Sequence, residues 1–167
     1  MKDNIMRNIK IEKVVLNIGG TADKVEKSIK LINKISGRKP IKTKARKRIP
    51  SLGVRPGLEI GSMVTIRKNP EEILKRLLVA KENKISRRKI AENHFSFGIK
   101  EYIEIPGMDY QRDIGIMGLD VTVVFRRAGK RVALRKMKKS HIPKKQIITK
   151  EEIIKFMEDK FKTEFTR

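Results

Sequence analysis

The stretch RKPIKTKARKRI, residues 38–49, has Lys or Arg at seven of its first eleven positions. Pro40 has no backbone N–H to donate, so it is expected to begin a strand or to lie on a sheet edge. Beyond it, alternate side chains of an extended backbone share a face. This alternation predicts two sets, with Ile41, Thr43 and Ala45 on one face and Lys42, Lys44, Arg46 and Arg48 outward on the other.

Cations on one side of such a strand recur about every 6.6 Å, a spacing that suits a row of phosphates. The wider window from Lys27 to Leu58 holds eleven basic residues and no Asp or Glu. A structural alternative is a solvated edge strand whose lysines prevent sheet-to-sheet aggregation. Seven cations without nearby acids repel one another, so phosphate binding is the favoured interpretation.

The composition points to a polyanionic partner. The chain has 167 residues, 42 Lys or Arg, 19 Asp or Glu, a net charge of +23 and a pI near 10.5. This length predicts one domain, residues 1–167, with a sizeable core. Nucleic acid is the first candidate partner and an anionic membrane surface the second.

Several classes of protein fit poorly. No apolar run approaches the roughly 18 residues of a membrane span, and the start MKDNIMR has no signal-peptide core. Without cysteine there is no disulfide framework or thiolate zinc site, and no cofactor or metal is expected. Aromatic residues make up 5% and Trp is absent, so stacking on single strands is not expected to dominate. Contact with the backbone of structured RNA or DNA fits better.

Two further strands flank the basic stretch in sequence. Residues 9–18 read as a strand with Val14, Leu16 and Ile18 toward the core and Asn17 outward, where Asn is equally often a turn former. Residues 59–67 predict a second strand, whose outward positions are Gly61, Met63, Thr65 and Arg67. Between them, helical spacing predicts a helix that ends near Gly37.

Helix and strand signals alternate without regular crossovers, which predicts an α+β fold. The run Asn69-Pro70-Glu71-Glu72 predicts a helix start, and Thr149 with Glu152 forms a capping-box pattern. The helix that follows is expected to dock on the domain as part of a basic C-terminal segment, residues 126–167.

A second basic block lies between residues 121 and 150, which hold eleven Lys or Arg and no acid. It is either a phosphate-contacting hairpin or a partly disordered segment, and contact is favoured. Its leading candidates are Arg126, Arg127, Lys130, Arg131 and Arg135.

Catalysis has little support in the sequence. Asp109, Asp113 and Asp120 would suit a metal-dependent nuclease only if the fold brought them together, and their spacing matches no ligand motif. The two histidines, His94 and His141, belong to no catalytic pattern. The protein is therefore not expected to be an enzyme.

Five segments, in order along the chain, resemble protein five of the large ribosomal subunit, the carrier of 5S rRNA, in its archaeal and eukaryotic branch. They are EKVVLNIGG (12–20), ISGRKPIKTKARK (35–47), GSMVTIR (61–67), NHFSFGIKEYIEIPG (93–107) and GLDVTVV (118–124). The resemblance implies a non-catalytic protein of the cytoplasmic ribosome, with a curved, mainly antiparallel sheet, helices on one face and an open basic RNA-binding face. The implied partners are 5S rRNA, large-subunit rRNA in the central protuberance, P-site tRNA and neighbouring proteins, including one of the small-subunit head.

The resemblance also implies site residues. Asn17, Arg38 and Thr65 match the family's polar RNA-recognition cluster, although position 38 is commonly glutamine there. The expected rRNA-binding set is Asn17, Arg38, Lys39, Lys42, Thr43, Lys44, Arg46, Lys47, Thr65 and Arg67. The residues alone favour an ordinary connection for loop 49–57, but the resemblance implies a tRNA-contacting loop made by Pro50, Ser51, Leu52, Gly53, Val54 and Arg55. A DNA-compacting architectural protein is the alternative from another class.

Overall fold

The computed structural model describes residues 4–21 and 23–166. The first three residues of MKDNIMR, the N-terminal stretch without a signal-peptide core, lie outside the described residues. A six-stranded sheet forms the body of the protein, in the order β2-β3-β1-β7-β6-β5, with every neighbouring pair antiparallel. Its strands are β1 (Lys10–Gly19), β2 (Ile41–Lys44), β3 (Glu59–Ile66), β5 (Ile90–Ala91), β6 (His94–Ile99) and β7 (Leu119–Arg126). A small parallel sheet pairs β4 (Lys84–Ser86) with β8 (Glu164–Thr166).

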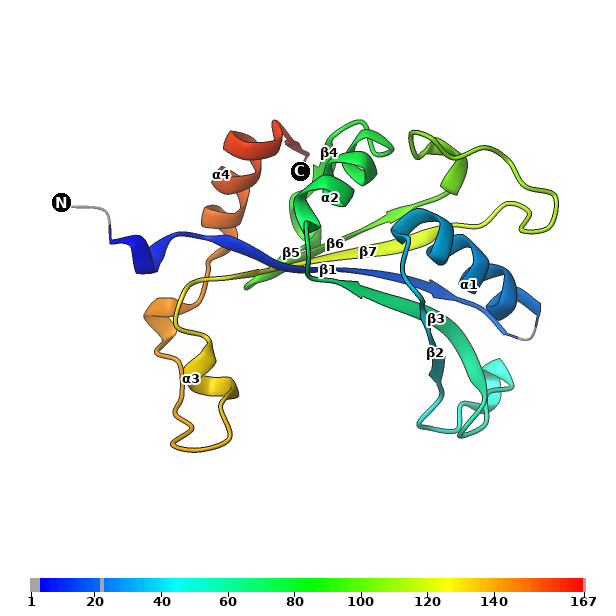
Figure 1. The fold of residues 1–167 in the computed structure, drawn as a ribbon, viewed down its shortest axis with the longest axis horizontal. Helices are drawn as coiled ribbons and strands as arrows, with labels where there is room; N and C mark the ends of the chain where they lie inside the picture. Colours follow the sequence, from blue (N-terminus) through cyan, green and yellow to red (C-terminus); the bar gives the residue numbers. More distant parts are fainter. Residues whose placement is uncertain (1–3, 22, 167) are drawn as a thin grey trace.

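The helices pack on one side of the large sheet (Figure 1). They are α1 (Asp23–Ser36), α2 (Pro70–Val79) and α4 (Lys150–Phe161), with the one-turn α3 (Arg131–Leu134) set apart from them. Short 3-10 turns occur at Ile5–Arg7, Pro50–Leu52, Arg87–Lys89, Tyr102–Glu104 and Lys144–Gln146. The predicted α+β fold with an open antiparallel sheet is therefore confirmed.

The alternation in β1 decides which face of the sheet is covered. Val14, Leu16 and Ile18 are almost fully buried. Residues directly opposite one another in antiparallel strands share a face, and Leu16 stands opposite Val64 of β3 and Val121 of β7. These side chains continue one apolar layer across the sheet, and α1 and α2 bury their leucines and isoleucines against it. The expected inward set of β1 is confirmed.

Among the described residues no long helix packs on the opposite face, which we call the open face (Figure 1). The strand registers assign to it Ile41 and Thr43 of β2, Gly61, Met63 and Thr65 of β3, Lys13, Val15 and Asn17 of β1, Asp120, Thr122 and Val124 of β7, and His94, Ser96 and Gly98 of β6. Most of these positions are half-exposed or exposed. Polar residues and glycine predominate here, beside the apolar Ile41, Met63, Val15 and Val124, whereas the covered face is aliphatic and aromatic, because only one face meets the core.

Two segments extend from the sheet on the side of the open face (Figure 1). The first arm, residues 45–58, joins β2 to β3, and the second arm, residues 127–147, joins β7 to α4. Between them the strands form an arch. The chain then returns to the helical side, where Ile148 donates its N–H to the Asn93 side chain and accepts from the Asn93 N–H.

Helix α4 begins with the predicted capping box. The Glu152 N–H donates to the Thr149 hydroxyl, and the Thr149 N–H donates to the Glu152 carboxylate. Ile153 and Met157 are fully buried in the common core. The C-terminal helix therefore docks on the body of the protein through its apolar side.

Candidate nucleic-acid interface

The first arm is an ordered structure that presents cations. Ala45 is buried and holds the base of the arm, because its N–H donates to Leu58 O at 2.8 Å and its carbonyl accepts from the Gly57 N–H at 2.9 Å. The basic residues around it are exposed and take part in no ion pair among the described residues: Lys44, Arg46, Lys47, Arg48 and Arg55. They are available to an external anion.

The tip of the first arm is also well ordered. Ile49 and Val54 exchange two backbone hydrogen bonds, of 2.9 and 3.1 Å, around a 3-10 turn at Pro50–Leu52. Gly53 closes the turn with φ of 64°, a left-handed conformation that glycine adopts without steric cost. Val54 is buried, whereas Leu52 is 72% exposed and Ser51 is exposed beside it. The loop therefore holds the large apolar side chain of Leu52 out in solvent.

The structure corrects the predicted phase of β2. Ile41 stands opposite Met63 on the open face and is 69% exposed, whereas Lys42 stands opposite Ser62, which is buried beneath α1. The Lys42 ammonium donates to the Glu59 carboxylate at 2.7 Å, and this hydrogen bond raises the pKa of Lys42 above 10.5. The two sets alternate as predicted, but the set expected to face outward is wrong, because pairing with β3 turns Ile41 and Thr43 toward the open face. The register also shifts between Thr43 and Lys44, where β3 contributes the extra residue Ile60.

Asn17 and Thr65 both lie on the open face, in adjacent strands. Asn17 stands opposite Met63, two positions along β3 from Thr65, so the two polar groups are diagonal neighbours. Arg38 is half-buried, and its guanidinium donates to the carbonyl of Lys68 at 3.0 Å, just beyond the end of β3. Lys39 and Arg67 are exposed. The structure thus fixes Arg38 at the sheet margin and leaves part of its guanidinium for other acceptors.

The second arm uses some of its cations within the fold. Arg127 is 9% exposed; its guanidinium pairs with Glu152 and donates to Lys145 O at 2.9 Å, which ties the two ends of the arm together. Lys130 pairs with Glu12 of β1. We therefore assign Arg127 and Lys130 to holding the arm in place.

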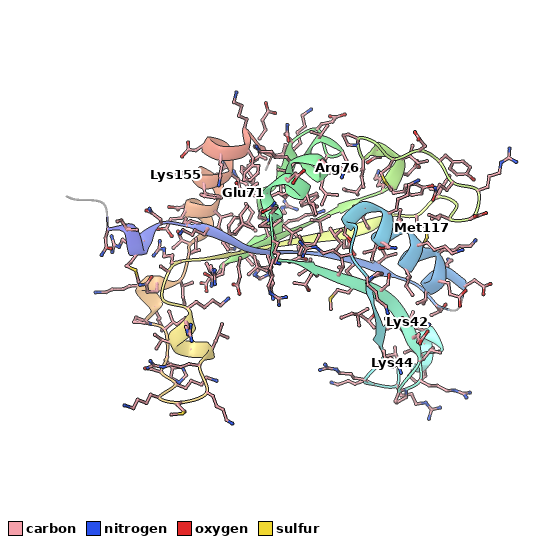
Figure 2. The ribbon with its side chains drawn as sticks, viewed as in Figure 1. Lys42, Lys44, Glu71, Arg76, Met117 and Lys155 are labelled. Atoms are coloured by element: carbon pink, nitrogen blue, oxygen red, sulfur yellow. The ribbon has the colours of Figure 1, made fainter. Side chains whose placement is uncertain are left out.

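The other leading cations of the second block take part in no ion pair among the described residues. Arg126 and Arg131 are exposed, and Arg135 is exposed while its Nε donates to Lys138 O at 2.6 Å. Figure 2 shows nitrogen-tipped side chains of both arms extending on the side away from α1 and α2. The basic side chains of the arms thus flank one common surface, the open face.

Sequence reasoning missed part of the open face. Ser96 of β6 and Thr122 of β7 stand opposite each other there, and Lys13 of β1 lies opposite Val124. The alternation Leu-Asp-Val-Thr-Val in β7 carries the signal that could have found Thr122, because its apolar residues occupy every second position. β6 carries the same signal for Ser96, because Phe95, Phe97 and Ile99 occupy every second position there.

The three acids considered as a nuclease centre do not form one. Among the residues that the structure describes, no group of three or more His, Cys, Asp or Glu is placed to hold a metal ion. Nor is any helix in residues 4–21 or 23–166 long and apolar enough to cross a membrane.

An open, curved sheet with helices on one face and two cationic arms beside the other has the shape and charge distribution of a nucleic-acid-binding protein. A family model described as ribosomal protein L5 matches residues 4–55, and a second model, for the C-terminus of the same ribosomal family, matches residues 59–156. The chain belongs to the ribosomal protein L5 family. It is a non-enzymatic, structural constituent of the large ribosomal subunit and works among rRNA and ribosomal proteins in the cytoplasmic ribosome.

Archaeal relatives are similar over almost the whole chain, and each is a large ribosomal subunit protein uL5. The protein of Nanoarchaeum equitans is 43% identical over 158 residues, which cover 92% of this chain and 94% of the relative. That of Archaeoglobus fulgidus is 41% identical, with 93% and 89% covered. That of Sulfolobus acidocaldarius is 39% identical, with 96% and 92% covered.

Proposed function

We propose that the open face and its two arms bind 5S rRNA together with large-subunit rRNA in the central protuberance. The observation that carries this proposal is the position of the arms: two basic segments far apart in sequence extend on the side of the sheet opposite α1, α2 and α4. The whole chain, residues 1–167, acts as one RNA-binding domain, with residues 126–167 docked on it.

The arms and the sheet have different tasks in this proposal. Exposed cations such as Lys44, Arg46 and Arg131 neutralise phosphates, which gives affinity without sequence information. Asn17 and Thr65, with the hydroxyls of Thr122 and Ser96, fix the position of the RNA by hydrogen bonds to ribose and base edges. Contacts with 2′-hydroxyl groups favour RNA over DNA.

Competition binding tests the proposal. At physiological salt, labelled 5S rRNA bound to the protein should resist a large excess of duplex DNA and should be displaced by unlabelled 5S rRNA. A DNA-compacting protein would release the RNA to duplex DNA at similar concentrations, because phosphate contacts alone do not distinguish the two. Equal competition by the duplex would refute the proposal.

We further propose that the first arm reaches P-site tRNA through its tip. The stable turn at Pro50–Leu52, the exposed Leu52 and the neighbouring Arg55 support this, because an ordered tip loses little entropy on contact. Replacing Leu52 by Ser should leave 5S rRNA affinity unchanged and weaken tRNA protection on assembled ribosomes. A small-subunit head protein across the subunit interface and neighbouring large-subunit proteins complete the proposed partners.

A further inference from the structure

Asp120 is an acid on the open face, in a strand that lies between the two cationic arms. Asp120 is the second residue of β7, where it stands opposite Gly98 of β6 on one side and Asn17 of β1 on the other. Asn17 in turn stands opposite Met63, which stands opposite Ile41. The registers therefore place these five residues in a single row across the sheet, all on the open face.

An acid in this position does not serve phosphate binding. Asp120 is exposed, and no ion pair among the described residues includes it, although this chain carries far more bases than acids. A carboxylate repels phosphate and accepts hydrogen bonds without donating any. Whatever RNA group approaches Asp120 must bring donors, and in RNA these are ribose hydroxyls and the amino and imino groups of bases.

The neighbours of Asp120 leave room for a base. Gly98 has no side chain, and a Cβ built there would lie 3.2 Å from the Asp120 carboxylate oxygen. The missing side chain at Gly98 therefore leaves a shallow recess over β6, beside the Asp120 carboxylate. On the other side, cross-strand partners have Cβ atoms about 5 Å apart, so the Asn17 amide and the Asp120 carboxylate can reach adjacent atoms of one ligand. Met63, half-buried, adds a polarisable apolar surface next to Asn17.

We infer that Asp120 and Asn17 together recognise the Watson–Crick edge of one unpaired guanine in the bound RNA, an inference that rests on the proposed function. Guanine alone presents two adjacent donors, N1–H and N2–H, that match the two carboxylate oxygens. Its O6 then accepts from the Asn17 amide. Adenine and cytosine place an acceptor beside their amino group, and uracil flanks its N3–H with two carbonyls, so each sets an acceptor against the carboxylate. Unpaired bases of RNA loops are commonly read on this edge.

The test uses 5S rRNA transcripts, each with one unpaired nucleotide replaced. With the wild-type protein, one guanine should stand out, with about a 10- to 100-fold loss of affinity for any other base at that position. Inosine there removes only the N2 amino group and should cause a smaller loss. With Asp120→Asn, guanine and inosine should bind equally, and the penalty for other bases should fall to about threefold or less.

Two further variants separate recognition from charge. Glu158→Gln on α4 removes one exposed negative charge on the helical side and should leave the guanine preference intact. Gly98→Ala keeps the charge but crowds the carboxylate, so it should also reduce the preference; circular dichroism checks that it folds.

Other outcomes would overturn the inference. If Asp120→Asn strengthened binding to every transcript equally, the carboxylate would act only as a repulsive charge. If the guanine penalty disappeared on removal of Mg²⁺, the carboxylate would hold a cation. Wild-type binding to 5S rRNA without any guanine preference would remove this inference alone, whereas failure to bind 5S rRNA would remove the proposed function.

Discussion

Neutralising the first arm is the most direct test of how this surface binds RNA. Replacing Lys44, Arg46 and Lys47 by Gln removes three exposed cations that no described acid pairs with. Each phosphate contact contributes roughly 0.7 to 0.9 to the slope of log affinity against log salt. If each cation engages one phosphate, the slope should shrink by roughly 2.1 to 2.7. If the variant and the wild type bind 5S rRNA equally at 1 M salt, the variant should bind it about 100- to 500-fold more weakly at 0.1 M salt.

The assay is filter or fluorescence binding to 5S rRNA between 0.05 and about 0.5 M salt, a range in which counterion release dominates. The matched control replaces three exposed lysines of the helical side, Lys30, Lys34 and Lys155, by Gln, which gives the same change in net charge. It should keep the slope within about half a unit, because these side chains contact no phosphate. The free energy of unfolding of both triple variants should lie within about 0.5 kcal/mol of the wild-type value. A control that loses as much affinity as the first-arm variant would refute the reasoning.

Three other predictions concern groups that the fold itself uses. Replacing Glu59 by Gln should return the pKa of Lys42 toward 10.5, as measured by NMR titration. Because the pKa of Lys42 is raised in the folded protein, the Lys42–Glu59 pair stabilises the fold fully below pH 10.5. This stabilisation is lost as the pH rises through the folded pKa. Replacing Arg127 by Ala should destabilise the protein by about 2 to 4 kcal/mol in urea unfolding, since it removes a buried side chain together with its bonds to Glu152 and to the Lys145 carbonyl. A change below about 0.5 kcal/mol would contradict the role assigned to Arg127. Replacing Ser62 alone by Ala should lower the free energy of unfolding by about 1 kcal/mol, because the buried Ser28 hydroxyl loses the hydrogen bond of 2.6 Å that it accepts from Ser62. Replacing both serines should lower it by less than the sum of the two single changes.

Where burial is one-sided, the sequence was a good guide to structure. The alternation in β1 and β3 correctly predicted the core face and the outward positions of Asn17 and Thr65, because water on one side and helices on the other enforce a period of two. The capping-box pattern at Thr149 predicted the start of α4 for an equally local reason.

At β2 the same reasoning gave the wrong phase. This strand has four residues and only one neighbouring strand, and its Ile41 is exposed, so its own pattern of side chains does not determine the register. The roles of Arg127 and Lys130 were also out of reach, because their acidic partners, Glu152 and Glu12, are distant in sequence.

By itself the sequence determined a strongly basic, cysteine-free α+β protein whose acid-free segments require a polyanionic partner, because charge and hydrophobic period are local properties of a chain. Only the tertiary structure decided that both basic segments flank one open face, that Lys42 belongs to the other side, and that Asp120 stands beside Asn17. Those facts depend on strand order and register, which join residues far apart in the chain, such as Asn17 and Asp120.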